Sequence, residues 1–158
     1  MNKVLLKLYN VGIVVSFLGS IIFTIVVLPY LFSLSAAEVD NIVIVKWIYY
    51  FIVIMFHAPF GYALLQVFKI LSLLKDDDFF KEQAINSLKK IIYSGLAIGC
   101  LHLLALILML ILGNYSELLG MLSIMVFVVS IIVSSFTYLL SVVLNRSITI
   151  KKENDLTI

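Results

Sequence analysis

The residues best suited to chemistry in this chain are two histidines inside apolar segments. His57 follows Trp47 by ten residues, and His102 follows Ile91 by eleven. If these segments cross a membrane as antiparallel neighbours, both imidazoles lie near the bilayer midplane and can meet. Histidine titrates near neutral pH, so the pair could relay protons or bind a solute. The alternative is a structural pair of neutral rings, hydrogen-bonded within the bundle, and this interpretation is favoured.

A metal site is a third interpretation of these residues, and their number argues against it. Two histidines are too few for a closed zinc shell, and Cys100 lies on a different helical face from His102. The three adjacent carboxylates Asp76–Asp78 do not converge on one ion, because hard-cation loops place their ligands at alternating positions. We expect them to offset the dipole of the following helix. The sequence therefore predicts no metal and no other cofactor.

Enzyme motifs are missing from the sequence. It contains no Ser-His-Asp set, no Cys-His pair at a catalytic spacing, no Gly-rich phosphate loop and no HExxH. No group is therefore available for nucleophilic, acid-base or metal-assisted catalysis in a recognised arrangement. We expect a protein that is not an enzyme.

The composition indicates a membrane protein. The 158 residues are 63% hydrophobic and 13% charged, whereas soluble domains are about 45–50% apolar and about 25% charged. A soluble chain of this size buries only part of its surface and cannot hide so much hydrocarbon. The single cysteine, Cys100, excludes an intrachain disulfide.

Four apolar segments are long enough to cross a bilayer, which takes about 20 residues. Val11 to Phe32 contains no charge and exceeds the apolar core of a signal peptide, about 7–15 residues. We therefore expect it to be retained, although Ser35–Ala37 is similar to a cleavage site. The sequence predicts a single all-α domain, residues 1–158, folded as an integral membrane bundle of four transmembrane helices. Their expected ranges are 11–32, 47–75, 80–112 and 118–144, followed by a charged tail at 145–158.

The longest polar interruption, Lys69–Lys90, contains five of the eleven lysines and arginines. Helical spacing continues into it from both sides, so we expect the second and third helices to extend into an elbow outside the membrane. Ten of the eleven basic residues lie on the same side as this elbow and both termini, and Lys46 lies opposite. The positive-inside rule therefore predicts that the elbow and both termini are cytoplasmic.

Small residues recur at helical spacing and predict close helix contacts. They lie in the first, third and fourth predicted helices, and the third contains a GxxxG pattern. In the fourth helix the hydroxyls on one face form either an interhelical seam, which we favour, or a polar conduit. The predicted packing residues are Gly12, Ser16, Ser20, Gly95, Gly99, Ser130, Ser134 and Thr137.

Two stretches carry a family resemblance. The elbow ILSLLKDDDFFKEQAINSLKKI and the terminal KKENDLTI resemble those of small bacterial four-helix membrane proteins, a family of unknown function sometimes called YoaS-like. Lys81 departs from the pattern, because a Ser or Thr usually follows the elbow phenylalanine. The resemblance implies a multi-pass protein of the bacterial cell (inner) membrane. It also implies a gene beside an Xre-type helix-turn-helix regulator and a role as that regulator's membrane-bound partner.

A cytoplasmic partner could bind the elbow and the tail, where aromatic and apolar side chains can anchor a protein. The alternative is that the elbow aromatics lie in the lipid headgroup layer and that the tail is solvated. The candidate contacts are Phe79, Phe80, Glu153, Asn154, Asp155 and Leu156.

Three functions follow from these observations. The first is a non-enzymatic regulatory partner of an Xre-type regulator that does not itself bind nucleic acid. The second is a small transporter or channel-like protein that uses His57 and His102. The third is a structural or immunity-type protein that occupies a site on a larger complex. In each case the lipid bilayer is a partner, and a homo-oligomer is an option.

Overall fold

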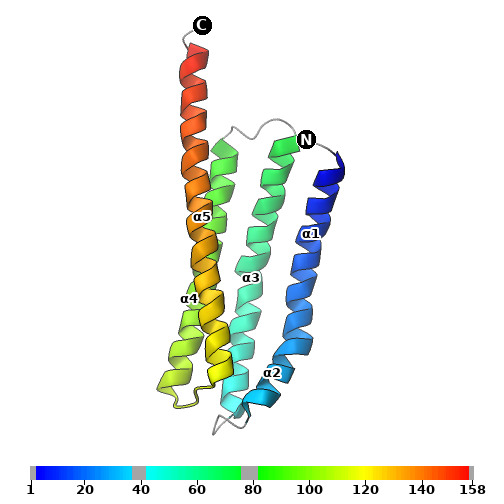
Figure 1. Cartoon of the computed structure of the whole chain (residues 1–158), viewed down its shortest axis with the longest axis vertical. Coiled ribbons are helices and arrows are strands. Elements are labelled where there is room, and N and C mark those ends of the chain that lie inside the picture. Colours follow the sequence, from blue (N-terminus) through cyan, green and yellow to red (C-terminus); the bar gives the residue numbers. More distant parts are fainter. Residues whose placement is uncertain (1–2, 37–41, 76–81, 157–158) are drawn as a thin grey trace.

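The computed structural model describes residues 3–36, 42–75 and 82–156. These residues are almost entirely helical, so the part of the chain that is described is all-α (Figure 1). A π-helix, η1, joins α1 to α2, and the three form one continuous rod. The elements are α1 (Lys3–Ile22), η1 (Phe23–Val27), α2 (Leu28–Ser35), α3 (Ile42–Lys75), α4 (Glu82–Ile111) and α5 (Glu117–Leu156).

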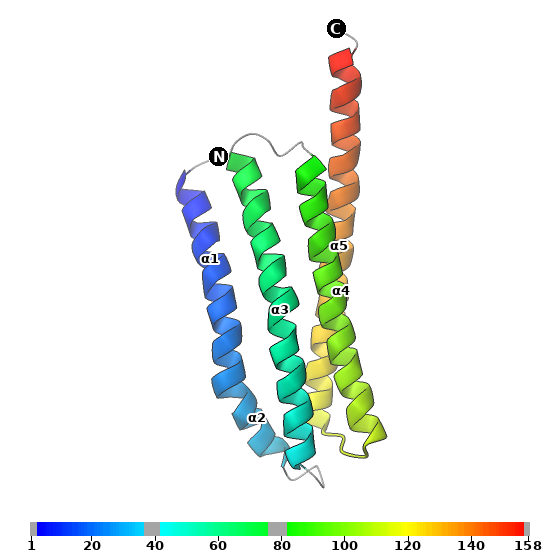
Figure 2. The same ribbon diagram turned by 180° about the vertical axis from the view of Figure 1, so that it is seen from behind.

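Four rods run side by side and alternate in direction (Figures 1 and 2). Helix α4 packs closely against both α3 and α5, whereas α1 contacts α3 more sparsely. The lower end of the first rod, α2, leans inward and reaches α3 and α5. Both chain ends lie at the same end of the bundle as the end of α3 and the start of α4, and α5 extends past the other rods.

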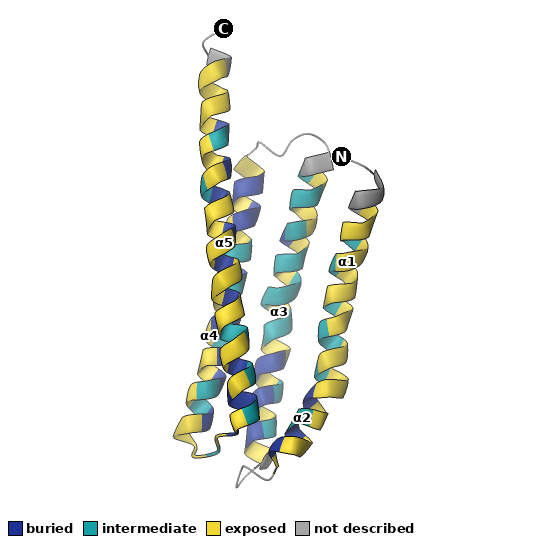
Figure 3. Cartoon of the chain, viewed as in Figure 1, coloured by how far each residue is buried: buried dark blue, intermediate teal, exposed yellow. Residues whose placement is uncertain are grey.

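Each rod is long and apolar enough to cross a membrane. The candidate spans are Lys7–Ser35, Val43–Leu73, Glu82–Ile111 and Glu117–Asn154. Their outward faces carry large apolar side chains that the bundle leaves exposed (Figure 3), as expected where lipid is the solvent. The predicted all-α fold with four transmembrane helices is confirmed.

The helix ends differ from those expected. The last helix continues from Leu144 to Leu156, and the first and second begin earlier than predicted, at Lys3 and Ile42. Hydropathy marks the thickness of the hydrocarbon, whereas a helix continues into water until a breaker stops it. In α5 this continuation is supported by Ile148, which is buried against α4. Residues 76–81 of the expected elbow lie outside the described residues.

The π-helix has an identifiable cause in Pro29. Proline has no N–H to donate, and its ring displaces the carbonyl four residues earlier, here that of Ile25. The helix responds with a wider turn, in which the N–H of Leu28 bonds to the carbonyl of Phe23, five residues before it. This turn re-aims α2 toward the bundle, where Leu28 and Phe32 become buried.

Two apolar clusters hold the rods together. The larger cluster joins α2, α3, α4 and α5 at the end of the bundle away from the termini. The smaller cluster joins the first turns of α4 to α5, on the side that is predicted to face the cytoplasm. The larger contains Leu28, Phe32, Val45, Tyr49, Ile52, Val53, Ala105, Met109 and Leu119. The smaller contains Ala84, Ile85, Leu88, Leu144 and Ile148.

The tight turn between α4 and α5 holds these two helices in register. Gly113 has φ +64°, a left-handed conformation that glycine adopts without strain. Its N–H donates to the Leu110 carbonyl, and the N–H of Asn114 donates to that of Met109 at 3.1 Å. Ser116 then caps α5 by accepting a hydrogen bond from the N–H of Leu119.

Candidate functional site

A cavity of about 200 Å³ lies inside the bundle, lined by residues from all four rods. Ser20 and Thr24 of the first rod, Phe56 of α3 and His102 of α4 all border it. Part of its wall is the π-helix, and π-helical turns occur often at functional sites. The cavity is mostly apolar, so its few polar atoms determine what it could bind.

His102 is the polar group of this cavity that has no internal partner. The side chain is 5% exposed, and its Nδ1 has no hydrogen-bond partner among the described residues. Buried polar atoms are normally paired. The imidazole therefore retains a free hydrogen-bonding position beside the cavity.

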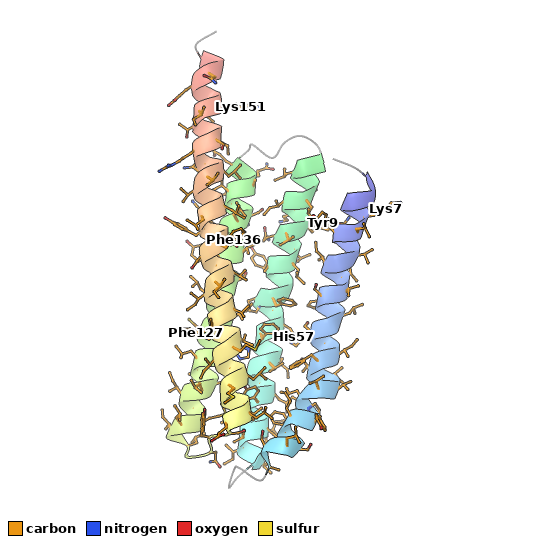
Figure 4. All side chains as sticks on the ribbon, viewed as in Figure 1. Lys7, Tyr9, His57, Phe127, Phe136 and Lys151 are labelled. Atoms are coloured by element: carbon orange, nitrogen blue, oxygen red, sulfur yellow. The ribbon has the colours of Figure 1, made fainter. Side chains whose placement is uncertain are left out.

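His57 is held differently. Its Nδ1 donates to the carbonyl of Val53, one turn earlier in α3, at 2.6 Å. Its Nε2 lies 3.5 Å from Oγ1 of Thr24 in the π-helix, and Phe17 packs edge-on against the ring at a centroid distance of 6.4 Å. Figure 4 shows His57 on α3, on the side facing the first rod. His57 thus links α3 to the first rod.

The two histidines do not hydrogen-bond to each other in the described part of the chain. Each packs edge-to-face against Phe56 instead, with centroid distances of 5.5 Å to His57 and 6.0 Å to His102. One phenyl ring therefore contacts both imidazoles.

Small residues bring α4 and α5 together. A Cβ added at Gly95 would overlap the hydroxyl of Ser134, and one added at Gly99 would crowd that of Ser130. The Ser130 hydroxyl donates to the Phe127 carbonyl at 2.7 Å. The buried hydroxyl of Thr137 likewise donates to a carbonyl of its own helix, at 2.7 Å.

These contacts form an interhelical seam. The Ser130 and Thr137 hydroxyls each donate their one O–H to a carbonyl of their own helix. The small residues of the first rod are arranged otherwise. Gly12 and Ser16 are exposed, and no heavy atom lies within 4 Å of a Cβ built at Gly12. Ser20 is half-buried and borders the cavity.

The candidate partner contacts are only partly described. Phe79 and Phe80 lie outside the described residues. Glu153 and Asn154 are exposed on the last turns of α5. Asp155 and Leu156 belong to the same helix, with side chains outside the described part. Figure 4 shows that nearby Lys151 lies on the portion of α5 beyond the other rods.

Tyr49 is a structural residue of the bundle. Its side chain is fully buried, whereas that of nearby Trp47 is 73% exposed. The Tyr49 hydroxyl donates to the Leu119 carbonyl at 2.7 Å and also contacts the hydroxyl of Ser123. Aromatic type and position alone do not distinguish a belt residue from a bundle residue.

The fold and the site define a multi-pass helical membrane protein. Within residues 3–36, 42–75 and 82–156 no group of three metal-ligating side chains gathers. Residues 12–158 match the family described as "Protein of unknown function (DUF2975)", and the chain belongs to that family. It is also similar to the "Uncharacterized membrane protein YoaS" of Bacillus subtilis (strain 168), with 27% identity over 160 residues. The alignment covers 100% of this chain and 98% of that protein.

No solved structure matches the chain. The family resemblance drawn from the elbow and the tail is confirmed by these comparisons.

Proposed function

We propose that this chain is a non-enzymatic protein of the bacterial inner membrane that binds an Xre-type helix-turn-helix regulator at the cytoplasmic surface. Both termini and the elbow face the cytoplasm in this proposal, as the placement of basic residues predicts. The single observation that carries it is the length of α5, which extends beyond the other rods (Figure 1). A rigid helix projecting from a membrane bundle offers a partner a defined surface.

The projecting part of α5 has a polar, accessible surface. Ile148 is 5% exposed and ends the packing against α4, while Ile150 is 58% exposed. The residues that follow, up to Asn154, are exposed and of mixed charge. Mixed charges give a protein interface specificity and steer association, and the exposed isoleucine provides an apolar anchor.

One ion pair links this segment to α4. Nζ of Lys152 lies 3.2 Å from a carboxylate oxygen of Glu82, at the start of α4. Both side chains are largely exposed, so the pair contributes little to stability. The contact shows that the last turns of α5 lie within reach of the start of α4, so that one partner can contact both helices.

Co-purification tests the proposal. The full-length protein is co-expressed with the Xre-type regulator encoded next to it and captured in detergent. We expect deletion of residues 153–158 to abolish capture, whereas Lys46→Gln, at the opposite end of the bundle, leaves it unchanged. Undiminished capture by the truncated protein would contradict the proposal. So would a neighbouring gene for a permease or an ATPase.

A small transporter or channel-like protein is the second candidate, favoured by the unpaired Nδ1 of His102 beside the cavity. The packing of both histidines against Phe56 rather than against each other, and the hydrogen bond of the Ser130 hydroxyl to its own helix, weaken it. Proton flux into proteoliposomes tests it. Flux that falls in His57→Phe and His102→Phe variants would support transport, and flux equal to that of empty liposomes would reject it.

A further inference from the structure

A second pocket, of about 390 Å³, opens between the last turns of α3 and the first turns of α4. Polar side chains from both helices line it, with Gln66, Lys69 and Ser72 on α3 facing Asn86, Ser87 and Lys90 on α4. Among the described residues that line it none is acidic.

Gln66 is the residue that points to a ligand. Its side chain is 1% exposed, and its Oε1 has no hydrogen-bond partner among the described residues. A buried amide oxygen without a donor is costly in a membrane protein. This oxygen accepts hydrogen bonds, so a ligand that carries hydroxyl groups can satisfy it.

Two lysines beside the pocket indicate that this ligand is negatively charged. Lys69 and Lys90 come from different helices and border one pocket. Neither forms an ion pair with a carboxylate among the described side chains. Two ammonium groups beside amide and hydroxyl donors, with no carboxylate among the described lining residues, favour an anion, and lysine binds phosphate as a point charge.

The position of the pocket indicates the source of the phosphate. It lies at the end of the apolar span Val43–Leu73, on the side that carries most of the basic residues. Basic pockets between transmembrane helices on the cytoplasmic side bind the headgroups of anionic lipids. We propose that this pocket binds a phosphate group, supplied by an anionic phospholipid such as phosphatidylglycerol, whose headgroup hydroxyls can donate to Gln66.

Lipid retention tests the proposal. The full-length protein is purified in detergent, mixed with phosphatidylglycerol or phosphatidylcholine, and examined by native mass spectrometry. We expect phosphatidylglycerol to be retained preferentially, and Lys69→Gln/Lys90→Gln to reduce its affinity by about tenfold or more. The control Lys151→Gln/Lys152→Gln removes the same charge from α5 and should bind as the unchanged protein does. Lys69→Arg/Lys90→Arg keeps the charge and should retain most of the binding.

A Gln66 variant and a titration with inorganic phosphate complete the experiment. Gln66→Leu should weaken phosphatidylglycerol binding even with both lysines present, and size-exclusion chromatography verifies that each variant is folded. Inorganic phosphate is titrated separately. Phosphate binding that the lysine variant loses, without lipid preference, would support the site and assign it to free phosphate. Equal retention of both lipids together with no phosphate binding, or undiminished binding by Lys69→Gln/Lys90→Gln, would overturn the proposal.

Discussion

The hydroxyl of Ser134 on α5 lies where it would overlap with a Cβ of residue 95 on α4. Glycine at position 95 therefore leaves room for this hydroxyl at the interface. The Ser134 hydroxyl lies 3.4 Å from the Ile92 carbonyl, to which it donates a hydrogen bond across the interface. Steric fit and a weak interhelical hydrogen bond together hold the seam, as in other small-residue contacts in membranes.

This relationship predicts a double-mutant cycle. Gly95→Ala should lower the free energy of unfolding by about 1–3 kcal/mol, because overpacking forces side chains or backbone to shift. Ser134→Ala should cost less, since its cross-helix hydrogen bond is long. The double variant should recover most of the loss, and this coupling is measured from denaturant titrations in mixed micelles.

A matched control is available in the first rod. No heavy atom lies within 4 Å of a Cβ built at Gly19, so Gly19→Ala should leave stability unchanged or raise it slightly, because alanine favours helix. If Gly95→Ala and Gly19→Ala had the same effect, the close approach at the seam would be refuted.

The buried hydroxyl of Tyr49 gives a second prediction. Removing it in Tyr49→Phe leaves the ring packing but takes a donor from the Leu119 carbonyl, which retains a hydrogen bond of 3.0 Å from Ser123. We expect a loss of about 0.5–1.5 kcal/mol in the free energy of unfolding. Tyr138→Phe, on an exposed position of α5, removes the same group and should cost nothing measurable. A larger loss from Tyr138→Phe would contradict the packing described for α5.

Residue types were sufficient to predict the four rods. An apolar run of the right length has few alternatives to a membrane helix, because the bilayer leaves backbone groups no other partners. The ends were less predictable. The run of apolar residues stops near Leu144, but the helix continues because Ile148 lies one turn later, on the face that packs against α4. A sequence pattern reports polarity and not which neighbour a residue meets.

The candidate site was harder to predict than the fold. The spacing of His57 and His102 correctly indicates that both lie within the spans, but it contains no information about Phe56, whose ring contacts both. The pocket at Gln66 depends on how α3 and α4 face each other. Such relationships arise from tertiary packing, which single residues and their spacing do not encode.

The orientation of the bundle is open to a direct test. In a Cys100→Ser background, a membrane-impermeant maleimide should label Lys46→Cys in intact cells and Lys89→Cys only after lysis. The reason is that basic residues near short loops remain on the cytoplasmic side. Labelling of Lys89→Cys from outside would invert the topology and with it the proposed cytoplasmic surface.

The extension of α5 can be tested with two isoleucines that are near neighbours in sequence. Ile148 is 5% exposed and packs in the cluster with Ala84 and Leu88, whereas Ile150 is 58% exposed. Ile148→Asp buries a charge in this cluster and should detach the end of α5, so that backbone amides of residues 145–154 exchange faster with deuterium. Ile150→Asp adds the same charge to an open face and should leave exchange unchanged. Equal protection in both variants would mean that α5 does not depend on α4 for its last turns, and the surface proposed for the regulator would then lack its rigid support.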